Sequence, residues 1–326
     1  MAALGKLFSY GPDNIDVLLT NSRSVIQKMA PEINDAIFNS IPLFKWLNNK
    51  ARVIKDGGAS ILTPVMFGKN TTWSSYNGLD LIDTGVQQGI TTAQYQWAGY
   101  AGTIALQGDE LRANAGAGKV FDYVKTKTMQ SMMSGRDKLG QDLFAASPGA
   151  KDINSLPIMV DATSTIADVN STTNTWWQSQ VVASGSFAAR GLADLRDLRD
   201  QIIQQGQNGA PAPDFIITTA LVKELYEAAL QPQMRYQQSG VGNATFGDGL
   251  KFSSSVMEFD PNCATGELYM ISSEALNLCV HREANLTVGK FVEPTNQDAR
   301  VAKVLWMGQL VSNNRRRLGK MTGITA

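Results

Sequence analysis

The chain has little of the chemistry that most enzymes use. Among its 326 residues there is one histidine, His281, and there are two cysteines, Cys263 and Cys279. Two cysteines are no disulfide framework, and neither stands at a spacing typical of metal ligands. We therefore expect two reduced, partly buried thiols in a reducing cytoplasm. A zinc site built on histidines would need more ligands than the chain has, so the sequence predicts neither a metal nor a cofactor.

An excess of charge is also missing. Lys and Arg number 29, Asp and Glu number 29, and the formal net charge is zero. A sequence-specific nucleic-acid-binding domain usually carries a basic excess, so that class of function is not indicated. A low net charge does little to keep copies of a protein apart. This composition therefore suits a protein that associates with itself.

Long apolar runs are absent from the sequence. No window approaches the roughly 18 consecutive apolar residues of a membrane-spanning helix, so we expect no membrane association. The segment Met1 to Tyr10 lacks the continuous apolar core of a signal peptide. With 43% hydrophobic residues, the chain is long enough to bury a sizeable core in one large or two modest domains.

Catalytic patterns give only weak matches. The nucleophile pattern G-x-S-x-G does not occur, and a lone histidine near a strand end is more often a hydrogen-bonded structural residue than a catalyst. Glycines in the range 240–249 lack phosphate-loop spacing and predict a flexible loop. Asp109 with Glu110, or Asp260 with Glu267, could serve as paired carboxylates for glycoside cleavage. Most chains of this size offer such pairs, so we predict no catalytic residue.

What the chain does contain is an unusual hairpin. The pattern predicts a long polar-and-aromatic strand pair over residues 60–105, with the turn dipeptide Asn77-Gly78 near its tip and a polar return segment over residues 80–89. Strict alternation over residues 92–97 is typical of a half-exposed strand. An isolated two-stranded ribbon is only marginally stable in water. We therefore expect the hairpin to lie on another molecule, most simply a second copy of the protein.

A long helix follows the hairpin. Apolar residues recur at steps of three and four and predict a helix over residues 118–147, which would span roughly 45 Å. Further helices are predicted at 188–205 and 221–230. Strands are predicted at 214–218, 251–259, 266–280 and 301–311. Because these elements do not alternate regularly as βαβ units, the sequence predicts an α+β fold.

The first fifty residues have the character of an arm. Residues 14–29 fit a short amphipathic helix that Pro31 ends. Its apolar face would consist of Ile15, Leu18, Leu19, Val25, Ile26 and Met29. A short apolar piece follows Pro42, from Leu43 to Leu47. Such a segment has little core of its own, although a helical subdomain packed on the main body is an equally good interpretation.

Two groups of residues are candidates for contacts between copies. The first consists of aromatic residues in the hairpin: Trp73, Tyr76, Tyr95 and Trp97. Aromatic side chains dominate interface energetics, although they could also stack on nucleic-acid bases. The second group is the densest basic run, Arg315, Arg316 and Arg317. It would either neutralise a few phosphates without reading sequence or pair with carboxylates of a neighbouring subunit.

The order of these parts resembles the major capsid proteins of tailed bacteriophages, which have the Hong Kong 97-like fold. Residues 43–47 (LFKWL) leading into Gly57-Gly58 and the hairpin are similar to such coat proteins. So is the C-terminal stretch VLWMGQLV at residues 304–311, with NNRRRLGKMTG at 313–323. The resemblance implies five parts: an N-terminal arm (1–53), an extended loop (54–110), a peripheral domain (111–180) with a spine helix (118–147), an axial domain (181–285), and a C-terminal return to the peripheral domain (286–326).

The resemblance also implies a function. It implies a subunit that assembles as pentamers and hexamers into the icosahedral head of a tailed phage around double-stranded DNA. The implied partners are other copies, scaffolding, portal and decoration proteins, and packaged DNA through non-specific contacts. The implied location is the virion capsid, after assembly in the host cytoplasm. Two alternatives stay open: the shell of an encapsulin-like bacterial nanocompartment and, from another class, a carboxylate-dependent hydrolase.

Overall fold

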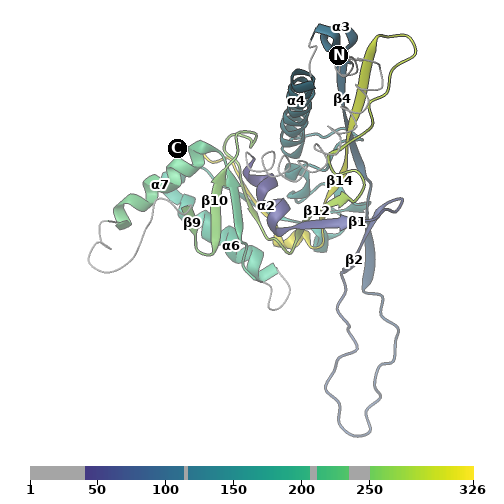
Figure 1. The fold of residues 1–326 in the computed structure, drawn as a ribbon. Coiled ribbons are helices and arrows are strands. Elements are labelled where there is room, and N and C mark those ends of the chain that lie inside the picture. The colour runs from purple at the N-terminus through teal and green to yellow at the C-terminus, as the bar shows by residue number, and fades with distance from the viewer. Residues whose placement is uncertain (1–40, 114–116, 206–210, 235–249) are drawn as a thin grey trace, which may run out of the picture.

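The structure is a computed structural model that describes residues 41–113, 117–205, 211–234 and 250–326 (Figure 1). Within these ranges it has the predicted α+β architecture, with two larger sheets and two small hairpins. The amphipathic helix predicted for residues 14–29 and the glycine-rich range 240–249 lie outside the described residues.

The first sheet forms the elongated part of the molecule. It has five strands in the described part of the chain: β1 (Arg52–Lys55), β4 (Ala98–Gln107), β12 (Leu276–His281), β13 (Thr287–Val288) and β14 (Ala299–Ser312). The two longest strands, β4 and β14, pair in antiparallel fashion from Ala98 opposite Gly308 to Gln107 opposite Ala299. The predicted hairpin over residues 60–105 was therefore too long, because β4 belongs to this sheet and has its partner almost two hundred residues away.

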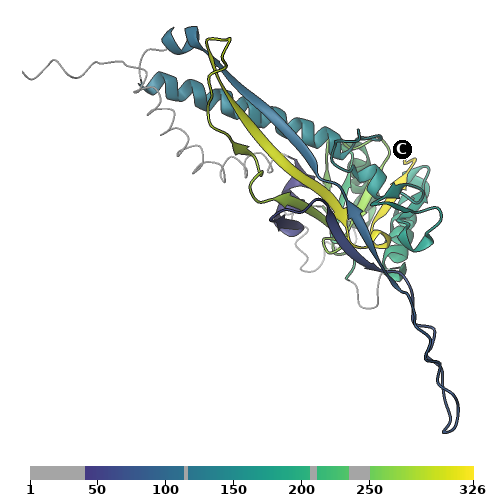
Figure 2. The ribbon, with the colours of Figure 1, turned by 90° about the vertical axis from the view of Figure 1, so that its right-hand side faces the viewer.

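A long helix lies against this ribbon of two strands. Helix α3 (Gly108–Ala113) follows β4, and α4 (Ala117–Leu143) then runs back along β4 and β14 (Figure 2). The predicted helix over 118–147 is confirmed, although it ends at Leu143 in a turn in which the Phe144 N–H donates to the Gln141 carbonyl. At about 1.5 Å per residue α4 is about 40 Å long. Val124, Met132, Leu139 and Leu143 form its buried stripe.

The second sheet has its own helices and core. Its order is β7 (Gln180–Ala183), β15 (Gly319–Thr322), β11 (Leu268–Ile271), β8 (Phe215–Thr218), β10 (Ser255–Phe259) and β9 (Leu250–Phe252). Helix α6 (Leu192–Gln205), preceded by a π-helical turn over Phe187–Gly191, packs on this sheet through Leu195, Leu198 and Ile202. The helix predicted over residues 188–205 is thus confirmed, with its first turn in the π-helical form.

Two features of the second sheet differ from the sequence prediction. Helix α7 (Ala220–Met234) continues through Pro232, beyond the predicted end at residue 230. The last strand, β15, joins the second sheet, whereas β12 belongs to the first. Each sheet therefore contains strands from both sides of residue 285, where the resemblance placed the end of the axial domain.

Short elements join the two sheets. They are α5 (Leu156–Met159), β5 (Thr165–Ile166), β6 (Val169–Asn170), and the 3-10 turns η1 (Thr175–Trp177) and η3 (Arg315–Arg317). The described chain begins beside α2 (Pro42–Lys50), with Pro42 in its first turn, where the missing N–H is tolerated. Leu43, Phe44 and Leu47 of α2 are buried in the main core. From residue 41 onward, the N-terminal segment is thus packed on the body.

Candidate assembly surface

A small hairpin leaves the body at the end opposite α3 (Figure 2). It consists of β2 (Ile61–Met66) and β3 (Ile90–Tyr95), with Ile61 opposite Tyr95 and Met66 opposite Ile90. Ala93 and Tyr95 are buried, and the intervening Gln94 is exposed. The alternation predicted for residues 92–97 is therefore confirmed, and one face of the hairpin base packs on the core.

Aromatic side chains fix the base of the hairpin to the body. The Tyr95 hydroxyl donates to the Ser312 carbonyl at 2.9 Å, and the Trp97 indole N–H donates to the Gly58 carbonyl at 2.9 Å. The ring of Phe67 stacks on Trp176 with centroids 5.2 Å apart. The base is therefore held by contacts inside the chain.

Beyond the base the two arms touch and then open. The Phe67 N–H donates to the Gly89 carbonyl at 2.8 Å, and a Cβ on Gly89 would lie 3.0 Å from the Gly68 carbonyl oxygen. Glycine at both positions permits this close approach. The predicted turn at Asn77-Gly78 is confirmed, with Gly78 at φ +45°. Within the extended loop of residues 54–110 that the resemblance implies, residues 67–90 are the part that projects from the body, and from here on the name extended loop refers to residues 67–90.

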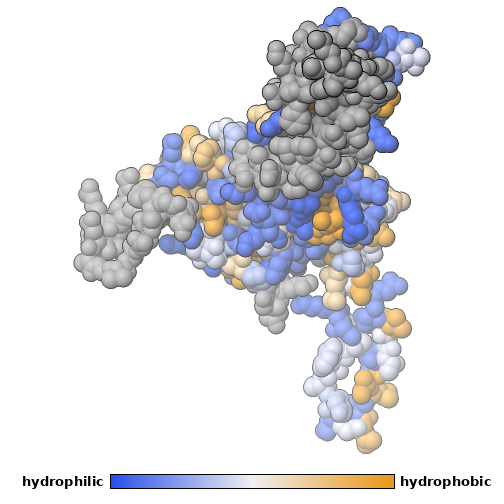
Figure 3. All heavy atoms as spheres, in the orientation of Figure 1, coloured by the Kyte–Doolittle hydropathy of each residue, from blue (hydrophilic) through white to orange (hydrophobic). Residues whose placement is uncertain are grey.

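The extended loop carries apolar side chains that its own chain does not cover. Ten of the twenty large apolar side chains exposed in the described part of the chain lie between Leu62 and Ile90. Eight of these belong to the extended loop: Phe67, Trp73, Tyr76, Leu79, Leu81, Ile82, Val86 and Ile90. Figure 3 shows groups of orange, hydrophobic spheres along the projecting loop. Large apolar patches on an exposed surface mark interaction sites.

The four predicted aromatic contacts divide into two pairs. Trp73 is 88% exposed and Tyr76 is 68% exposed, so both are available to a partner. Tyr95 is buried, and Trp97 is half-buried with its ring edge-on to His281 at 5.8 Å. Tyr95 and Trp97 therefore anchor the hairpin inside this chain.

Sequence reasoning missed the aliphatic part of the extended loop. Residues 80–89 were interpreted as a polar return segment, yet Leu81, Ile82 and Val86 are exposed there, and Leu79 just before them is 100% exposed. The sequence did hold a signal for this exposure. The aliphatic residues lie between Asp80, Asp83 and glycines, and the segment has neither strand nor helix periodicity. Aliphatic residues in such a segment have no core to enter.

The arginine run lies mostly inside the protein, so contacts within the chain engage the side chains that were predicted to meet a neighbour or DNA. Arg315 and Arg317 are buried. Arg317 donates to the Glu274 carboxylate at 2.8 Å and to the Ser272 hydroxyl at 2.9 Å. Arg316 donates to the side-chain oxygen of Gln205. The partners of all three side chains belong to the same chain.

Arg315 lies in a cage of oxygen atoms. Its guanidinium donates to the carbonyls of Met159 at 2.9 Å and Asp161 at 2.7 Å, and to the hydroxyls of Ser164 and Ser171. The charged group also lies 5.9 Å from the ring centre of Trp177. Burial lowers the pKa of Arg315 to about 10. This cluster holds residues 158–171 against η3 and is structural.

The candidate carboxylates do not converge on a pocket. Asp109 and Glu110 are exposed on α3, whereas Asp260 is fully buried, and this burial raises its pKa. Glu267 accepts a hydrogen bond from the Tyr269 hydroxyl. A cavity of about 470 Å³ lies between α4 and the β4–β14 ribbon, and none of the described residues that line it is Asp or Glu. This arrangement does not support the hydrolase alternative.

His281, Cys263 and Cys279 make contacts of a structural kind. The Nδ1 atom of His281 accepts a hydrogen bond from the Glu283 N–H at 3.2 Å. Cys263 and Cys279 are free thiols and both are buried, more completely than the sequence predicted. Burial raises the pKa of the Cys263 thiol to about 12, so it is protonated at neutral pH. Among the described residues, no cluster of three potential metal ligands occurs, and no helix has the length and apolarity to span a bilayer.

Comparisons with known proteins identify the fold. No known family's sequence profile and no curated protein sequence matches the chain. Among solved structures, the capsid asymmetric unit of cyanophage A-1(L) matches with a TM-score of 0.60 and 13% identity, covering 88% of this chain and 93% of that one. A structure from Mycobacterium phage Bobi matches with a TM-score of 0.56 and 11% identity, covering 86% and 90%.

A third similar structure belongs to a different kind of shell. The holo-SrpI encapsulin complex of Synechococcus elongatus matches with a TM-score of 0.52 and 9% identity, covering 86% of this chain and 87% of that one. All three matches extend over most of the chain. The protein therefore has the fold of shell-forming proteins, and specifically that of phage capsid proteins, as the sequence resemblance predicted.

Proposed function

We propose that this chain is the major capsid protein of a tailed phage. It assembles as pentamers and hexamers into an icosahedral head that encloses double-stranded DNA. The observation that carries the proposal is the extended loop, whose apolar side chains have no cover within the chain while its base is fixed to the body. The likeness in fold to a cyanophage capsid supports it.

The physical basis of assembly is burial of the extended loop on a neighbour. Fully burying a large apolar side chain contributes about 1.5–3 kcal/mol relative to leaving it exposed. Leu79, Leu81 and Val86 are almost fully exposed in the single chain, so each can contribute most of that amount. Because the loop of one copy would meet a different surface on the next, the contact is heterologous and closes into rings when the rotation fits.

The remaining partners follow from this role. Packaged DNA would meet the inner face through weak, non-specific contacts, and scaffolding, portal and decoration proteins would bind the assembled shell. The protein would be located in the virion capsid after assembly in the host cytoplasm, and it would carry no catalytic activity. The internal engagement of Arg315 and Arg317 leaves these two arginines unavailable to phosphates, which fits a wall rather than a DNA clamp.

Size-exclusion chromatography and negative-stain imaging of the purified protein test this proposal. Megadalton particles are the expected result, and a monodisperse monomer at high concentration would contradict it. Co-purification separates the two kinds of shell, because a phage head would bring DNA or a portal, whereas an encapsulin-like compartment would bring a cargo enzyme.

Deleting residues 71–85 tests the role of the extended loop. The deletion spares β2, β3 and the glycine contact at the base, so the body is expected to keep its circular dichroism spectrum while the particles disappear. Normal particles from this variant would refute the role assigned to the loop.

A further inference from the structure

Strand β4 has a free edge. Its partner β14 exchanges two backbone hydrogen bonds between Val301 and Val292, on the side away from β4. Odd-numbered residues of β14 therefore point their peptide groups away from β4, and the even-numbered residues pair with it. On β4 the peptide groups of four residues then point to the outer side: Gly99, Ala101, Thr103 and Ala105. Among the described residues, none of these peptide groups has a hydrogen-bond partner.

This edge lacks the features that usually protect edge strands. Over residues 98–107 (AGYAGTIALQ), β4 has neither a proline nor a charged side chain. At about 3.3 Å per residue, the strand is about 33 Å long. Exposed edge strands are usually short, charged or interrupted by proline, because a free edge readily pairs with another chain. The edge of β4 is therefore suited to the addition of a further strand.

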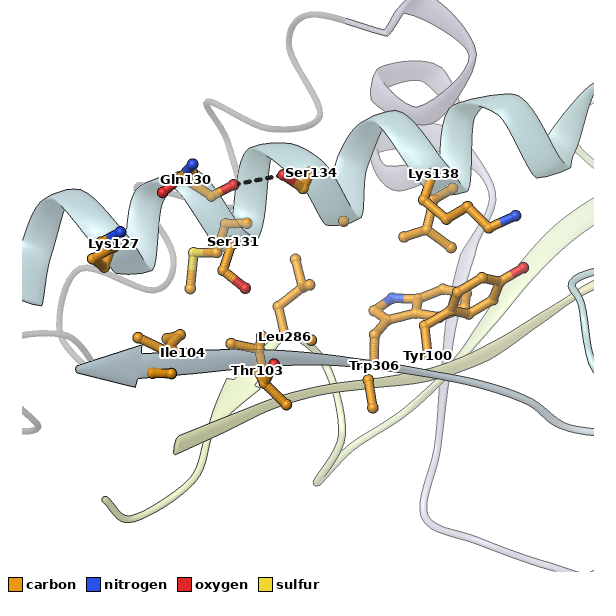
Figure 4. Close-up of a pocket in the computed structure, with 17 residues that line it drawn as sticks. Tyr100, Thr103, Ile104, Lys127, Gln130, Ser131, Ser134, Lys138, Leu286 and Trp306 are labelled. Atoms are coloured by element: carbon orange, nitrogen blue, oxygen red, sulfur yellow. Dashed lines mark hydrogen bonds between the residues drawn. The ribbon is translucent and has the colours of Figure 1, made fainter. Parts of the chain in front are cut away.

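A groove runs along the same edge. The cavity of about 470 Å³ between α4 and the ribbon is lined by Ala101, Thr103 and Ala105 of β4 and, on the helix, by Ser131 and Lys138. Figure 4 shows the helix and the strand on opposite sides of this space. An extended chain that pairs with β4 would enter the groove. One row of its side chains would face α4, and the other row would lie on the outer face of the ribbon.

One polar atom inside the groove lacks a partner. Trp306 is 2% exposed, and its indole Nε1 has no hydrogen-bond partner among the described residues. The nitrogen faces the space between helix and ribbon (Figure 4), where the walls are apolar side chains such as Ile104, Met132 and Leu139. A buried N–H without an acceptor is destabilising. The row of side chains that faces α4 should therefore be mostly apolar and should include one acceptor.

The extended loop also lacks partners for its main chain. Residues 69–88 are all described, and their one backbone–backbone hydrogen bond is that of the turn, from the Asp80 N–H to the Asn77 carbonyl at 3.1 Å. The two arms of the loop form no strand pair with each other. The return arm, residues 79–88, has ten residues, as β4 does. The arm and the edge can therefore give each other the hydrogen bonds that both lack.

The side chains of the return arm fit the groove. Three residues at alternate positions share one face of an extended arm: Ile82, Thr84 and Val86. They place two apolar groups around a hydroxyl that can accept the Trp306 N–H. Asp80 lies on the same face and can meet Lys127 or Lys138, because no described residue that lines the groove is acidic. Leu79 and Leu81 share the opposite face, which would cover the small residues on the outer side of β4.

We propose that the return arm of one copy adds as a strand to the free edge of β4 in a neighbouring copy. The main chain of the arm pairs with the peptide groups at positions 99, 101, 103 and 105, and the hydroxyl of the partner subunit's Thr84 accepts the Trp306 N–H. The inference rests on the proposed function, because it names the surface on which the extended loop is buried. The small residues on the outer face of β4 leave room for the leucines of the arm.

A cysteine scan tests the strand pairing. Thr103→Cys is combined in turn with a cysteine at each position from 79 to 87, and the protein is oxidised mildly at high concentration. Opposed residues of paired strands have Cα atoms about 5.5 Å apart, within the reach of a disulfide. Thr103 faces the outer side, as the odd-numbered residues of the arm would. Intermolecular disulfides are therefore expected at neighbouring odd-numbered positions, at least about tenfold above the even-numbered positions between them.

Thr103→Cys alone is the matched control. Cross-linking of this variant to itself would show that two β4 edges pair with each other and would overturn the proposal. Equal yields at odd and even positions, or no cross-link at any position, would overturn it as well. Cys263 and Cys279 are buried and are present in every variant. Sedimentation velocity of the unmodified chain scores particle formation separately, so normal particles without the alternating pattern would refute the strand addition and leave the proposed function intact.

A proline at the free edge gives a second measurement. Ala101→Pro removes an N–H that points away from β14, and an edge strand tolerates proline at such a position. Ala101→Ser keeps this N–H and is the matched control. Ala101→Pro should raise the protein concentration needed for assembly by about tenfold, while both unassembled variants unfold at the same urea concentration. Equal assembly of the two variants would overturn the proposal. If the proline variant fails to fold, the cysteine scan decides.

Discussion

The Tyr95 hydroxyl makes two hydrogen bonds to one residue, donating to the Ser312 carbonyl at 2.9 Å and accepting from the Ser312 N–H at 3.2 Å. Tyr95 ends β3 and Ser312 ends β14. The contact therefore ties the extended loop to the main sheet at a buried point. A fixed base below an exposed apolar loop is what a subunit needs in order to present that loop to a neighbour.

Tyr95→Phe should destabilise the base of the hairpin. The substitution keeps the ring in the core but removes both hydrogen bonds to Ser312, so we expect a loss of about 1–3 kcal/mol in the free energy of unfolding. Urea unfolding of the unassembled chain measures it. Tyr76→Phe is the matched control, because Tyr76 is exposed and its loss should stay within about 0.5 kcal/mol. Equal effects of the two substitutions would argue against the anchor.

Tyr95 should also make stability fall at alkaline pH. Burial raises the pKa of Tyr95 from 10.0 to about 12, so the unfolded chain loses this proton at lower pH than the folded chain. The contribution of the neutral Tyr95 side chain to the free energy of unfolding is therefore fully present below pH 10 and is lost as the pH rises to about 12. Between these pH values, the wild type should lose about 2–3 kcal/mol more than Tyr95→Phe.

Urea unfolding of both proteins at several alkaline pH values measures this difference. The Cys263 thiol, whose pKa is also raised to about 12 by burial, is present in both proteins, so its contribution cancels. Parallel stability profiles for wild type and Tyr95→Phe would show that the tyrosine does not titrate as described.

Arg315→Lys should be strongly destabilising although it preserves the charge. The guanidinium donates to carbonyls and hydroxyls that come from several directions, and a lysine has fewer donors and a different geometry. We expect a loss of about 3 kcal/mol or more, measured by thermal or urea unfolding. Arg316→Lys, one residue away, should change stability far less, because Gln205 is the only partner in the described hydrogen bonds of the Arg316 side chain. A small effect at both positions would contradict the structural role of Arg315.

Gly308→Ala should destabilise the long ribbon. A Cβ at this position would lie 2.7 Å from the Trp306 ring and 2.8 Å from the Cys279 carbonyl oxygen, so we expect a loss of about 1–3 kcal/mol. Gly99 lies on the paired strand, next to the partner of Gly308, and has nothing within 4 Å of such a Cβ. Gly99→Ala should therefore be neutral or slightly stabilising. The difference in melting temperature between the two variants tests this contrast.

Periodic patterns and turn dipeptides predicted helix α4, strand β3 and the turn of the extended loop. The apolar stripe of α4 and the alternation in β3 each follow from a periodic face that packs on the core, so both could be predicted within a few residues. The turn at Asn77-Gly78 was equally local. These are the parts of the fold in which neighbours along the chain decide the structure.

Long-range pairing explains what could not be predicted. Residues 98–107 follow the hairpin directly in sequence, yet they pair with β14, which no local pattern indicates. Three consecutive arginines are typical of a surface, and only the oxygen cage from residues 158–171 makes burial of Arg315 possible. Likewise, residues 80–89 were interpreted as a polar segment, and only the structure shows that their aliphatic side chains are exposed on a projecting loop.

The central claim is that the exposed aliphatic side chains of the extended loop hold copies of the protein together. Leu79, Leu81 and Val86 are almost fully exposed, so replacing all three with Ser should leave the stability of the single chain unchanged. The control replaces the exposed Ser74 and Ser75 with Ala. The most direct measurement is the sedimentation velocity of the two variants. The account predicts megadalton particles for the control and none for the triple variant, and wild-type particle yield from the triple variant would contradict it.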